Sequence, residues 1–299
     1  MKFKKIIIFS EHSKKKGLGH YIRSKRLYDC IKKKFNTKLL FNKKKKEIRK
    51  ILSNLNHNFL IIFDLSKYSK KIFIKNKKIF YITFENSKIK IKNSIIINPL
   101  DLDKKILSGP KWFAYPNNFF DTSILNKKKK NFNNIFISQG GTDAYNNLKN
   151  IIKLLNPLQK KLNLKLFVKV PKKNYFHQKF IKKHNVREVH NLDNIKSFLS
   201  NIDLSICGCG NLSFEINFWG IPAVFVSSIK KEIIRGKKLQ NMGFGKFYIP
   251  SQREKIREEI CKIIYNELYY NKIKRKKKLF FKHNGLKNLT KLISKLFNA

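Results

Sequence analysis

Acidic residues are scarce in this chain. Its 299 residues include 18 Asp and Glu against 68 Lys and Arg, which gives a formal net charge of +50. Most cations therefore have no anionic partner, and a fold stabilised by a dense network of surface ion pairs is excluded. Glycine is also scarce, at 12 residues. The few glycines and carboxylates that remain are the positions where a physical requirement is most to be expected.

Cysteine is too rare, and too irregularly spaced, for structural cross-links or zinc. The four cysteines are Cys30, Cys207, Cys209 and Cys261. Their spacing matches neither a disulfide framework nor a zinc site, so we expect reduced thiols and no metal. Cys207 and Cys209 are predicted to act as small apolar residues.

Long apolar runs are missing as well. No run approaches 18 residues, so no segment is expected to span a bilayer. Residues 1–9 combine lysines with Ile-Ile-Ile-Phe, as a signal peptide begins. The apolar run is too short for one, and no small-residue cleavage site follows, so we expect the first strand of a cytoplasmic protein.

Apolar residues are nevertheless plentiful. They make up 42% of the chain and include 26 Phe, which suffices for a packed core and excludes disorder. The length suggests two domains of ordinary size.

The charge of +50 has two interpretations. A basic protein is a candidate for nucleic-acid binding. However, the enriched residues Lys, Ile, Asn and Phe have AT-rich codons, and only four Ala are present. A low-GC genome would produce the same balance by drift, and no recognition-helix, RNP or zinc signature appears. We therefore expect no nucleic-acid partner.

The apolar pattern predicts strands that alternate with helices. Continuous apolar runs, typical of strands buried on both faces of a parallel sheet, occupy 4–10, 59–65, 78–83, 94–98, 134–138, 164–170, 204–207 and 222–227. Helices are expected after Gly17, over 145–155 and over 286–297. This alternation predicts an α/β layer fold.

A run of four lysines at 127–130 divides this pattern into two similar halves, and we interpret it as a linker. The predicted organisation is a Rossmann-like domain over 1–128, a second Rossmann-like domain over 131–282, and a C-terminal helix over 283–299. Glycine turns at the ends of strands in both halves would place a ligand in a crevice between them.

The first glycine turn carries a histidine. Gly17 and Gly19 precede His20 between the first strand and the first helix. Glycines allow close backbone approach to a ligand, and a helix N-terminus favours an anion. An imidazole at this place is a candidate general base, although a lone His more often packs or caps a helix.

The second half has two further turns. Gly140 and Gly141, with Asp143 and Asn147 behind them, suit a backbone cradle for phosphate. Asp143 is also a candidate helix cap, because Asp is a preferred residue there.

The other turn runs from Gly208 to Asn211 and opens a helix that carries Glu215. Helix amides can bind a diphosphate, and a carboxylate one turn later can accept hydrogen bonds from ribose hydroxyls. The alternative for Glu215 is a surface carboxylate favoured by the helix dipole.

These residues carry a resemblance to a known family. The segments GLGHYIR, ISQGGTDAYNN and ICGCGNLSFEINFWGIPAVFV occur in its order, as do LSGPKW before the linker and Asn284-Gly285 before the last helix. The chain resembles the UDP-2,4-diacetamido-2,4,6-trideoxy-altropyranose hydrolase of pseudaminic acid biosynthesis and related spore-coat polysaccharide proteins. That family is similar to the peptidoglycan N-acetylglucosaminyltransferase, which implies a GT-B fold with a C-terminal helix returning to the first domain.

The resemblance implies roles for individual residues. His20 matches the histidine that activates water, and Asp64 matches an Asp after a buried strand. Glu215 matches the carboxylate that holds the ribose. The remaining expected substrate contacts are Gly17, Gly19, Arg23, Gly140, Gly141, Asp143, Asn147, Gly210 and Asn211.

The chain also departs from the family pattern. Gly210-Asn211-Leu212 stands where Gly-Ser-Thr is usual, and Tyr115-Pro116 replaces Leu-Arg. Lys231 and Glu232 lie where a Gln is expected, and Glu85 alone remains of an acidic pair. The identity of the sugar is therefore open.

The resulting hypothesis is a monomeric enzyme that hydrolyses a UDP-linked amino or deoxy sugar without metal or cofactor, with His20 as general base. The alternative is a GT-B glycosyltransferase that moves the sugar to a polysaccharide or lipid-linked acceptor, with peripheral membrane contact.

Overall fold

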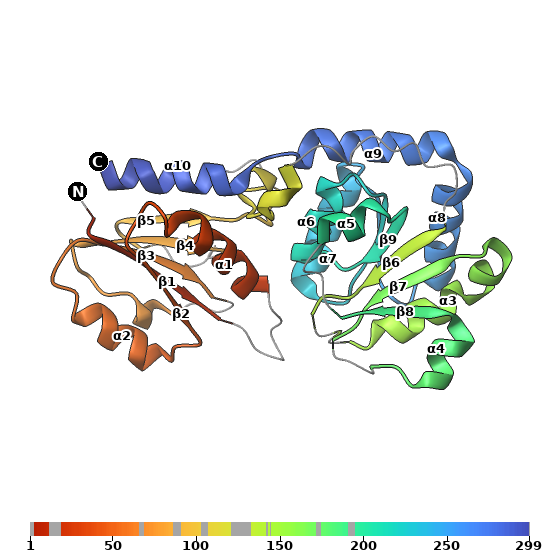
Figure 1. Ribbon diagram of the computed structural model, residues 1–299, viewed down its shortest axis with the longest axis horizontal. Coiled ribbons are helices and arrows are strands. Elements are labelled where there is room, and N and C mark those ends of the chain that lie inside the picture. Colours follow the sequence, from red (N-terminus) through yellow and green to blue (C-terminus); the bar gives the residue numbers. More distant parts are fainter. Residues whose placement is uncertain are drawn as a thin grey trace. The chain divides into compact units, whose positions relative to one another are not determined.

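The computed structural model of the chain consists of two compact units (Figure 1). One contains residues 1–116 and 283–299, and the other contains residues 117–282. The structure describes residues 3–11, 19–65, 69–85, 91–102, 107–120, 133–141, 143, 145–171, 175–190 and 195–298.

The first unit is built on a five-stranded parallel sheet. Its strands, in the spatial order β2-β1-β3-β4-β5, are β1 (Lys5–Ser10), β2 (Thr37–Phe41), β3 (Phe59–Asp64), β4 (Ile79–Phe84) and β5 (Ser94–Ile97). In the register of β1 and β3, Ser10 lies opposite Asp64. Both strands therefore end at the same edge of the sheet.

Three α-helices cover this sheet on its two faces. They are α1 (Gly19–Ile31), α2 (Lys45–Ser53) and α10 (Gly285–Asn298). Leu27 of α1 and Leu289 of α10 share one cluster with Ile8. Leu52 of α2 packs with Phe9 on the other face. Neighbouring residues of one strand thus face opposite layers, which is why the central strands β1 and β3 are apolar along most of their length.

The second unit has a six-stranded parallel sheet in the order β11-β10-β9-β6-β7-β8. Its strands are β6 (Asn134–Ser138), β7 (Lys165–Lys169), β8 (Val186–Val189), β9 (Leu204–Cys207), β10 (Ala223–Val226) and β11 (Lys246–Tyr248). Its helices are α3 (Asn147–Leu162), α4 (Gln178–His184), α5 (Ile195–Ser200), α6 (Asn211–Phe218), α7 (Lys230–Asn241), α8 (Arg253–Tyr265) and α9 (Glu267–Phe281). One core cluster joins the sheet to α3 and α8.

The predicted α/β fold with parallel sheets is confirmed. Strands β6 and β9 have the predicted bounds, and the other predicted strands agree to within one residue at each end. The units divide between Pro116 and Asn117. The linker was expected later, at 127–130, which lies outside the described residues. Phe119 explains the earlier division, because its ring packs 5.2 Å from Phe218 and 5.4 Å from Trp219 of the second unit.

The C-terminal helix α10 belongs to the first unit. It packs against α1 and against the short 3₁₀ turn Pro110–Trp112. The Asn288 side chain donates to the Lys111 carbonyl at 2.8 Å. A side chain at Gly285 would collide with the Phe113 backbone, so only glycine allows the helix to begin so close to that segment.

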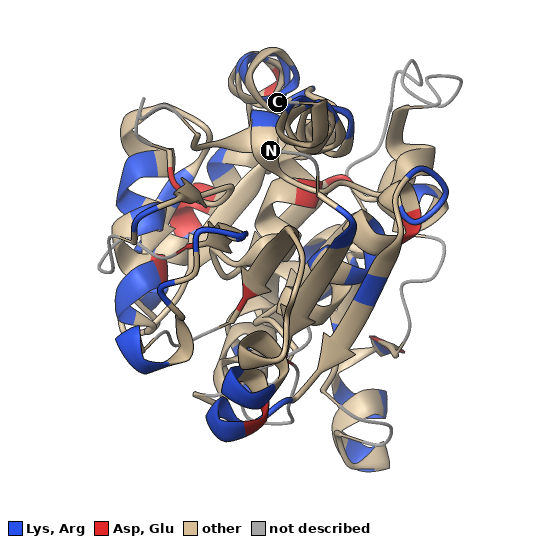
Figure 2. Cartoon of the chain, turned by 90° about the vertical axis from the view of Figure 1, so that its left-hand side faces the viewer, with Lys and Arg blue, Asp and Glu red and all other residues tan. Residues whose placement is uncertain are grey.

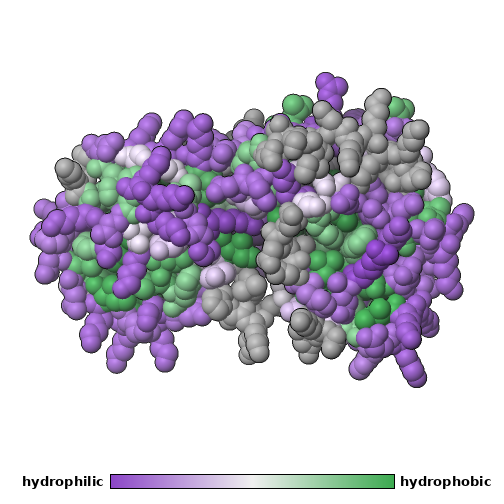
Figure 3. Space-filling model, viewed as in Figure 1, coloured by the Kyte–Doolittle hydropathy of each residue, from purple (hydrophilic) through white to green (hydrophobic). Residues whose placement is uncertain are grey.

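Cations are dispersed over the chain. Lys and Arg lie on helices, strands and loops of both units, with few Asp and Glu among them (Figure 2). The face drawn in Figure 3 is largely hydrophilic, with small groups of hydrophobic residues between. Within the described ranges, no helix combines the length and the apolar character needed to cross a membrane.

Candidate functional site

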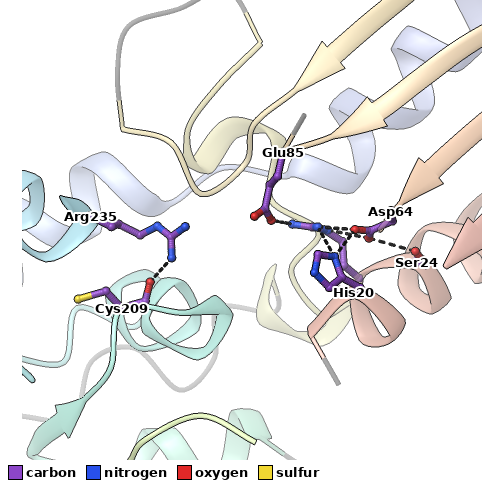
Figure 4. Close-up of polar contacts among 7 residues, drawn as sticks. His20, Ser24, Asp64, Glu85, Cys209 and Arg235 are labelled. Carbon is purple, nitrogen blue, oxygen red and sulfur yellow. Dashed lines mark hydrogen bonds and ion pairs between the residues drawn. The ribbon is translucent and has the colours of Figure 1, made fainter. Parts of the chain in front are cut away.

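A cluster of polar side chains lies where the strands of the first sheet end (Figure 4). His20 is the second residue of α1, and Asp64 is the last residue of β3. The His20 Nδ1 lies 2.6 Å from the Asp64 Oδ1. The sequence analysis named His20 from its glycine turn and Asp64 from the family resemblance, and the structure brings them into direct contact.

Arg23 and Ser24 fix the Asp64 carboxylate from the next turn of α1. The Arg23 guanidinium donates from Nε to Oδ2 at 2.8 Å and from Nη2 to Oδ1 at 2.5 Å. The Ser24 hydroxyl donates to Oδ2 at 3.0 Å. Asp64 is fully buried, and a buried carboxylate keeps its charge only when it is paired and hydrogen-bonded in this way.

Glu85 completes the cluster. It follows β4, has a left-handed backbone (φ 57°), and accepts from Arg23 Nη1 at 2.6 Å. The Arg23 guanidinium also lies over the Phe84 ring, 5.0 Å from its centroid. Arg23 thus ties α1 to the ends of both β3 and β4. Its burial indicates a positioning role, although the sequence nominated it as a substrate contact.

The charges of this cluster stabilise one another. Burial by itself raises the pKa of Asp64, but attraction to Arg23 and hydrogen bonds from Arg23 and His20 outweigh it, so this pKa lies well below its usual range. Burial by itself lowers the pKa of Arg23, and attraction to Asp64 and Glu85 instead holds it above its usual range. The carboxylate and the guanidinium therefore stay charged at neutral pH.

The contact with Asp64 selects the tautomer of His20. An ionised carboxylate only accepts hydrogen bonds, so the His20 Nδ1 carries the proton and donates it to Asp64. The Arg23 Nη2 also lies 3.3 Å from Nδ1, which makes this the longer of the two contacts of Nδ1, so the 2.6 Å contact with Asp64 decides where the proton lies. In the neutral ring, the Nε2 atom then keeps the lone pair. With 18% of its side chain exposed, His20 combines the orientation and the access that a general base requires.

The second unit contains a small polar pocket. It is lined by Gln139, Asp143, Tyr145, Asn147, Ser227, Ser228, Ile229 and Glu232. Its free space is about 220 Å³, part of which is open solvent, so it is smaller than the sites that usually enclose a whole small molecule. The Asn147 amide donates to Gln139 Oε1 at 3.3 Å.

Asp143 caps helix α3. Its carboxylate accepts from the backbone N–H of Asn147 at 2.8 Å and of Leu148 at 3.3 Å, and from the Tyr175 hydroxyl at 2.9 Å. Burial raises the pKa of Asp143, and these hydrogen bonds offset only part of that rise. Of the two roles that the sequence left open, the capping role is the one that the structure shows.

The turn before α6 is occupied by a carboxylate of the chain itself. Glu232 Oε2 accepts from the Cys209 backbone N–H at 3.0 Å and from the Ser227 hydroxyl at 2.9 Å. A side chain at Gly208 would lie 2.7 Å from Oε2, and one at Gly210 would lie 3.1 Å from Oε1. The glycines that the sequence assigned to a bound diphosphate thus make room for Glu232.

The other predicted residues occupy the two turns or their helices. Gly140 has a positive φ of 78°, which favours glycine, and Gly141 follows it in an exposed turn. Gly210 precedes α6, and Asn211 is its first residue. Glu215 is buried on α6, which contradicts the alternative of a surface carboxylate. Gly19 begins α1, while Gly17 lies outside the described residues.

Sequence reasoning did not assign Ser24, Tyr175 or Glu232 to a site. Glu85 was noted only as a departure from a family pattern, although it follows a buried strand just as Asp64 does. The place of Glu85 after a buried strand was the feature from which its part in the cluster could have been predicted. Glu232 was likewise noted only as a departure, at the place of a family Gln, while Tyr175 belongs to no motif and no pattern along the chain identifies it.

Metal ligands are not grouped in the described part of the chain. No three His, Cys, Asp or Glu residues within it are arranged to hold a metal ion. Cys207 and Cys209 are buried, as predicted, and burial raises the pKa of the Cys207 thiol to about 12. These thiols are inert packing residues at neutral pH.

Comparisons with known proteins identify the fold. No family model matches the chain. This chain is 25% identical over 266 residues to the uncharacterized protein MJ1062 of Methanocaldococcus jannaschii. The aligned region covers 74% of this chain. The chain spans about half, 55%, of the length of that relative.

Three solved structures cover nearly the whole chain. MurG of Acinetobacter baumannii has a TM-score of 0.60 at 13% identity, with 99% of this chain and 100% of that chain covered. The Neisseria meningitidis UDP-GlcNAc 2-epimerase bound to UDP-GlcNAc has a TM-score of 0.63 at 12% identity, covering 97% and 100%. The spinosyn rhamnosyltransferase SpnG complexed with thymidine diphosphate has a TM-score of 0.66 at 9% identity, covering 97% and 100%. The chain has the GT-B fold.

The buried ion pair predicts a defined pH dependence of stability. Asp64→Asn removes the buried carboxylate partner of Arg23, leaves it only Glu85, and lowers the free energy of unfolding at pH 7 by about 3–5 kcal/mol. Because the folded-state pKa of Asp64 is depressed, its contribution is present above the unfolded pKa of about 3.9 and is lost as the pH falls through the folded value. Urea unfolding of both proteins should therefore show a difference in stability that is present at pH 7 and shrinks below pH 4.

Proposed function

We propose that this chain is a nucleotide-sugar-processing enzyme, which hydrolyses a UDP-linked amino or deoxy sugar to free sugar and UDP. The observation that supports it most is the His20 imidazole, whose Nδ1 is fixed to Asp64 and whose Nε2 is left as a base. Hydrolysis requires only such a base and a site for the leaving diphosphate.

In this reaction, His20 Nε2 accepts a proton from water as the water oxygen attacks the anomeric carbon. The bond between that carbon and the diphosphate oxygen breaks, and UDP leaves with the electron pair. Asp64, held by Arg23 and Ser24, stabilises the imidazolium that forms. The proton on Nε2 then passes to solvent or to UDP, which restores the base.

The proposal assigns nucleotide binding to the second unit. Backbone groups of Gly140, Gly141, Gly210 and Asn211 would contact the phosphates, and Glu215 the ribose. Asn147 lines the small pocket, and Asp143 supports it by capping α3. Two GT-B proteins similar in fold support this class of ligand, since one holds UDP-GlcNAc and another thymidine diphosphate.

The second candidate function is a glycosyltransferase. Among the proteins of similar fold, SpnG is a rhamnosyltransferase. A transferase would use the same histidine to deprotonate an acceptor hydroxyl in place of water, so His20 cannot distinguish the two. A polysaccharide or lipid-linked acceptor would bring the protein, acting as a monomer, to a membrane surface.

Replacing the base tests the role of His20. His20→Asn and His20→Ala should abolish UDP release from a UDP-sugar substrate while the affinity for UDP stays within about twofold, because an ideally placed base contributes to the rate rather than to nucleotide binding. The exposed His57 provides the matched control, and His57→Asn should keep the wild-type rate. A wild-type rate in the His20 variants would contradict the mechanism.

The two candidate functions differ in what happens without an acceptor. A panel of UDP-sugars should first be screened for ligands that raise the melting temperature, since binding to the native state stabilises it. Hydrolysis predicts that UDP is released from the stabilising sugar nucleotide in buffer alone, with a rate that an added acceptor does not raise. UDP release that strictly requires an acceptor would instead establish the transferase.

A further inference from the structure

The position that the Glu232 carboxylate occupies at the Gly208–Gly210 turn, called the seat below, has the properties of an anion-binding site. It combines the Cys209 backbone N–H, the Ser227 hydroxyl and the N-terminal end of α6, where the helix dipole is positive. Gly208 and Gly210 keep the seat open to an oxygen atom, because a Cβ at either position would crowd the carboxylate. In the structure the anion that fills this seat is the carboxylate of Glu232.

Glu232 reaches the turn from a separate element. It is the third residue of α7, while the turn connects β9 to α6. Ser227 holds it in place by donating to Oε2 while its own oxygen accepts from the Ile229 N–H. The two direct contacts with the carboxylate are single hydrogen bonds to a half-buried side chain, so rotation of that side chain would release the seat without unfolding either helix.

The other backbone group of Cys209, its carbonyl, is bound by a cation. The Arg235 Nη1, one turn further along α7, donates to the Cys209 carbonyl (Figure 4). Glu232 and Arg235 thus hold the N–H and the C=O of Cys209 from one helix. If the carboxylate left, the guanidinium would remain beside the turn, and the local charge would become favourable to phosphate.

The charge of the small pocket is negative, and thus unfavourable to phosphate, while the Glu232 carboxylate occupies the seat. The lining of the pocket contains two carboxylates, Asp143 and Glu232, and among its described residues no Lys or Arg, in a chain of net charge +50. Such a lining repels a diphosphate, and its free space is small. Withdrawing one side chain, Glu232, would remove a negative charge and enlarge the space at once.

We propose that Glu232 is an internal competitor for the phosphate groups of the nucleotide. Its carboxylate occupies the seat on the Gly208–Gly210 turn, and a substrate diphosphate binds by displacing it. Glu232 therefore sets the affinity for phosphate-bearing ligands without contacting the nucleoside. This inference rests on the proposed function, because it concerns the diphosphate part of the same site.

Titration calorimetry on three variants tests the competition. Glu232→Gln keeps the size of the side chain and an acceptor for the Cys209 N–H while removing the charge, and Glu232→Ala empties the seat. Both should bind UDP and inorganic pyrophosphate about tenfold more tightly than the wild type or better, a change that corresponds to ~1.4 kcal/mol. Uridine, which has no phosphate, should bind all forms equally. The exposed Glu254 gives the control Glu254→Gln, which should resemble the wild type.

The outcomes are distinct. Unchanged or weakened binding of both UDP and pyrophosphate in either folded variant would overturn the inference, as would a gain for uridine as large as that for UDP. Melting temperatures identify a variant that fails to fold, and Glu232→Gln then decides the matter alone. If pyrophosphate binds the variants more tightly while uridine, UDP and UDP-sugars bind no form, the competition holds and the proposed nucleotide function fails.

Discussion

The buried ion pair between Asp64 and Arg23 is the interaction on which the first unit's site depends. It joins the end of β3 to the second turn of α1, and Arg23 extends the link to β4 through Glu85. A buried carboxylate is costly unless its charge is neutralised. Here the Arg23 guanidinium neutralises it, and the Ser24 hydroxyl donates a further hydrogen bond to its oxygen. Its remaining partner is the His20 imidazole. The orientation of the histidine thus follows from an electrostatic requirement of the core.

The second unit also uses carboxylates to hold its turns. Asp143 satisfies the backbone amides at the start of α3, and Glu232 satisfies the amide of Cys209 before α6. Both are places where a helix N-terminus would otherwise attract an external anion. In a chain with 18 carboxylates, several of them thus lie at turns and strand ends rather than in surface ion pairs. Lys and Arg, in contrast, are dispersed over both units.

Apolar runs predicted the central strands because those strands are buried on both faces, as β3 and β9 show. The sequence analysis missed β2 (TKLLF), β8 (VREV) and β11 (KFY), which are short edge strands that each carry a charged side chain. Among the helices it also missed α7, whose sequence is mostly polar. His20 was predictable from its glycine turn at the start of a helix, and Asp64 was named through the family resemblance. The contact between Glu232 and the glycine turn before α6 was not predictable, because it joins residues from two elements that no local pattern connects.

The central claim is that Asp64 fixes His20 as a base with its lone pair on Nε2. Nitrogen-15 NMR of the histidine rings at neutral pH measures this directly, because protonated and unprotonated ring nitrogens have different shifts. The account predicts that the neutral His20 ring carries its proton on Nδ1, and that Asp64→Asn removes this preference. A wild-type ring with its proton on Nε2 would contradict the account.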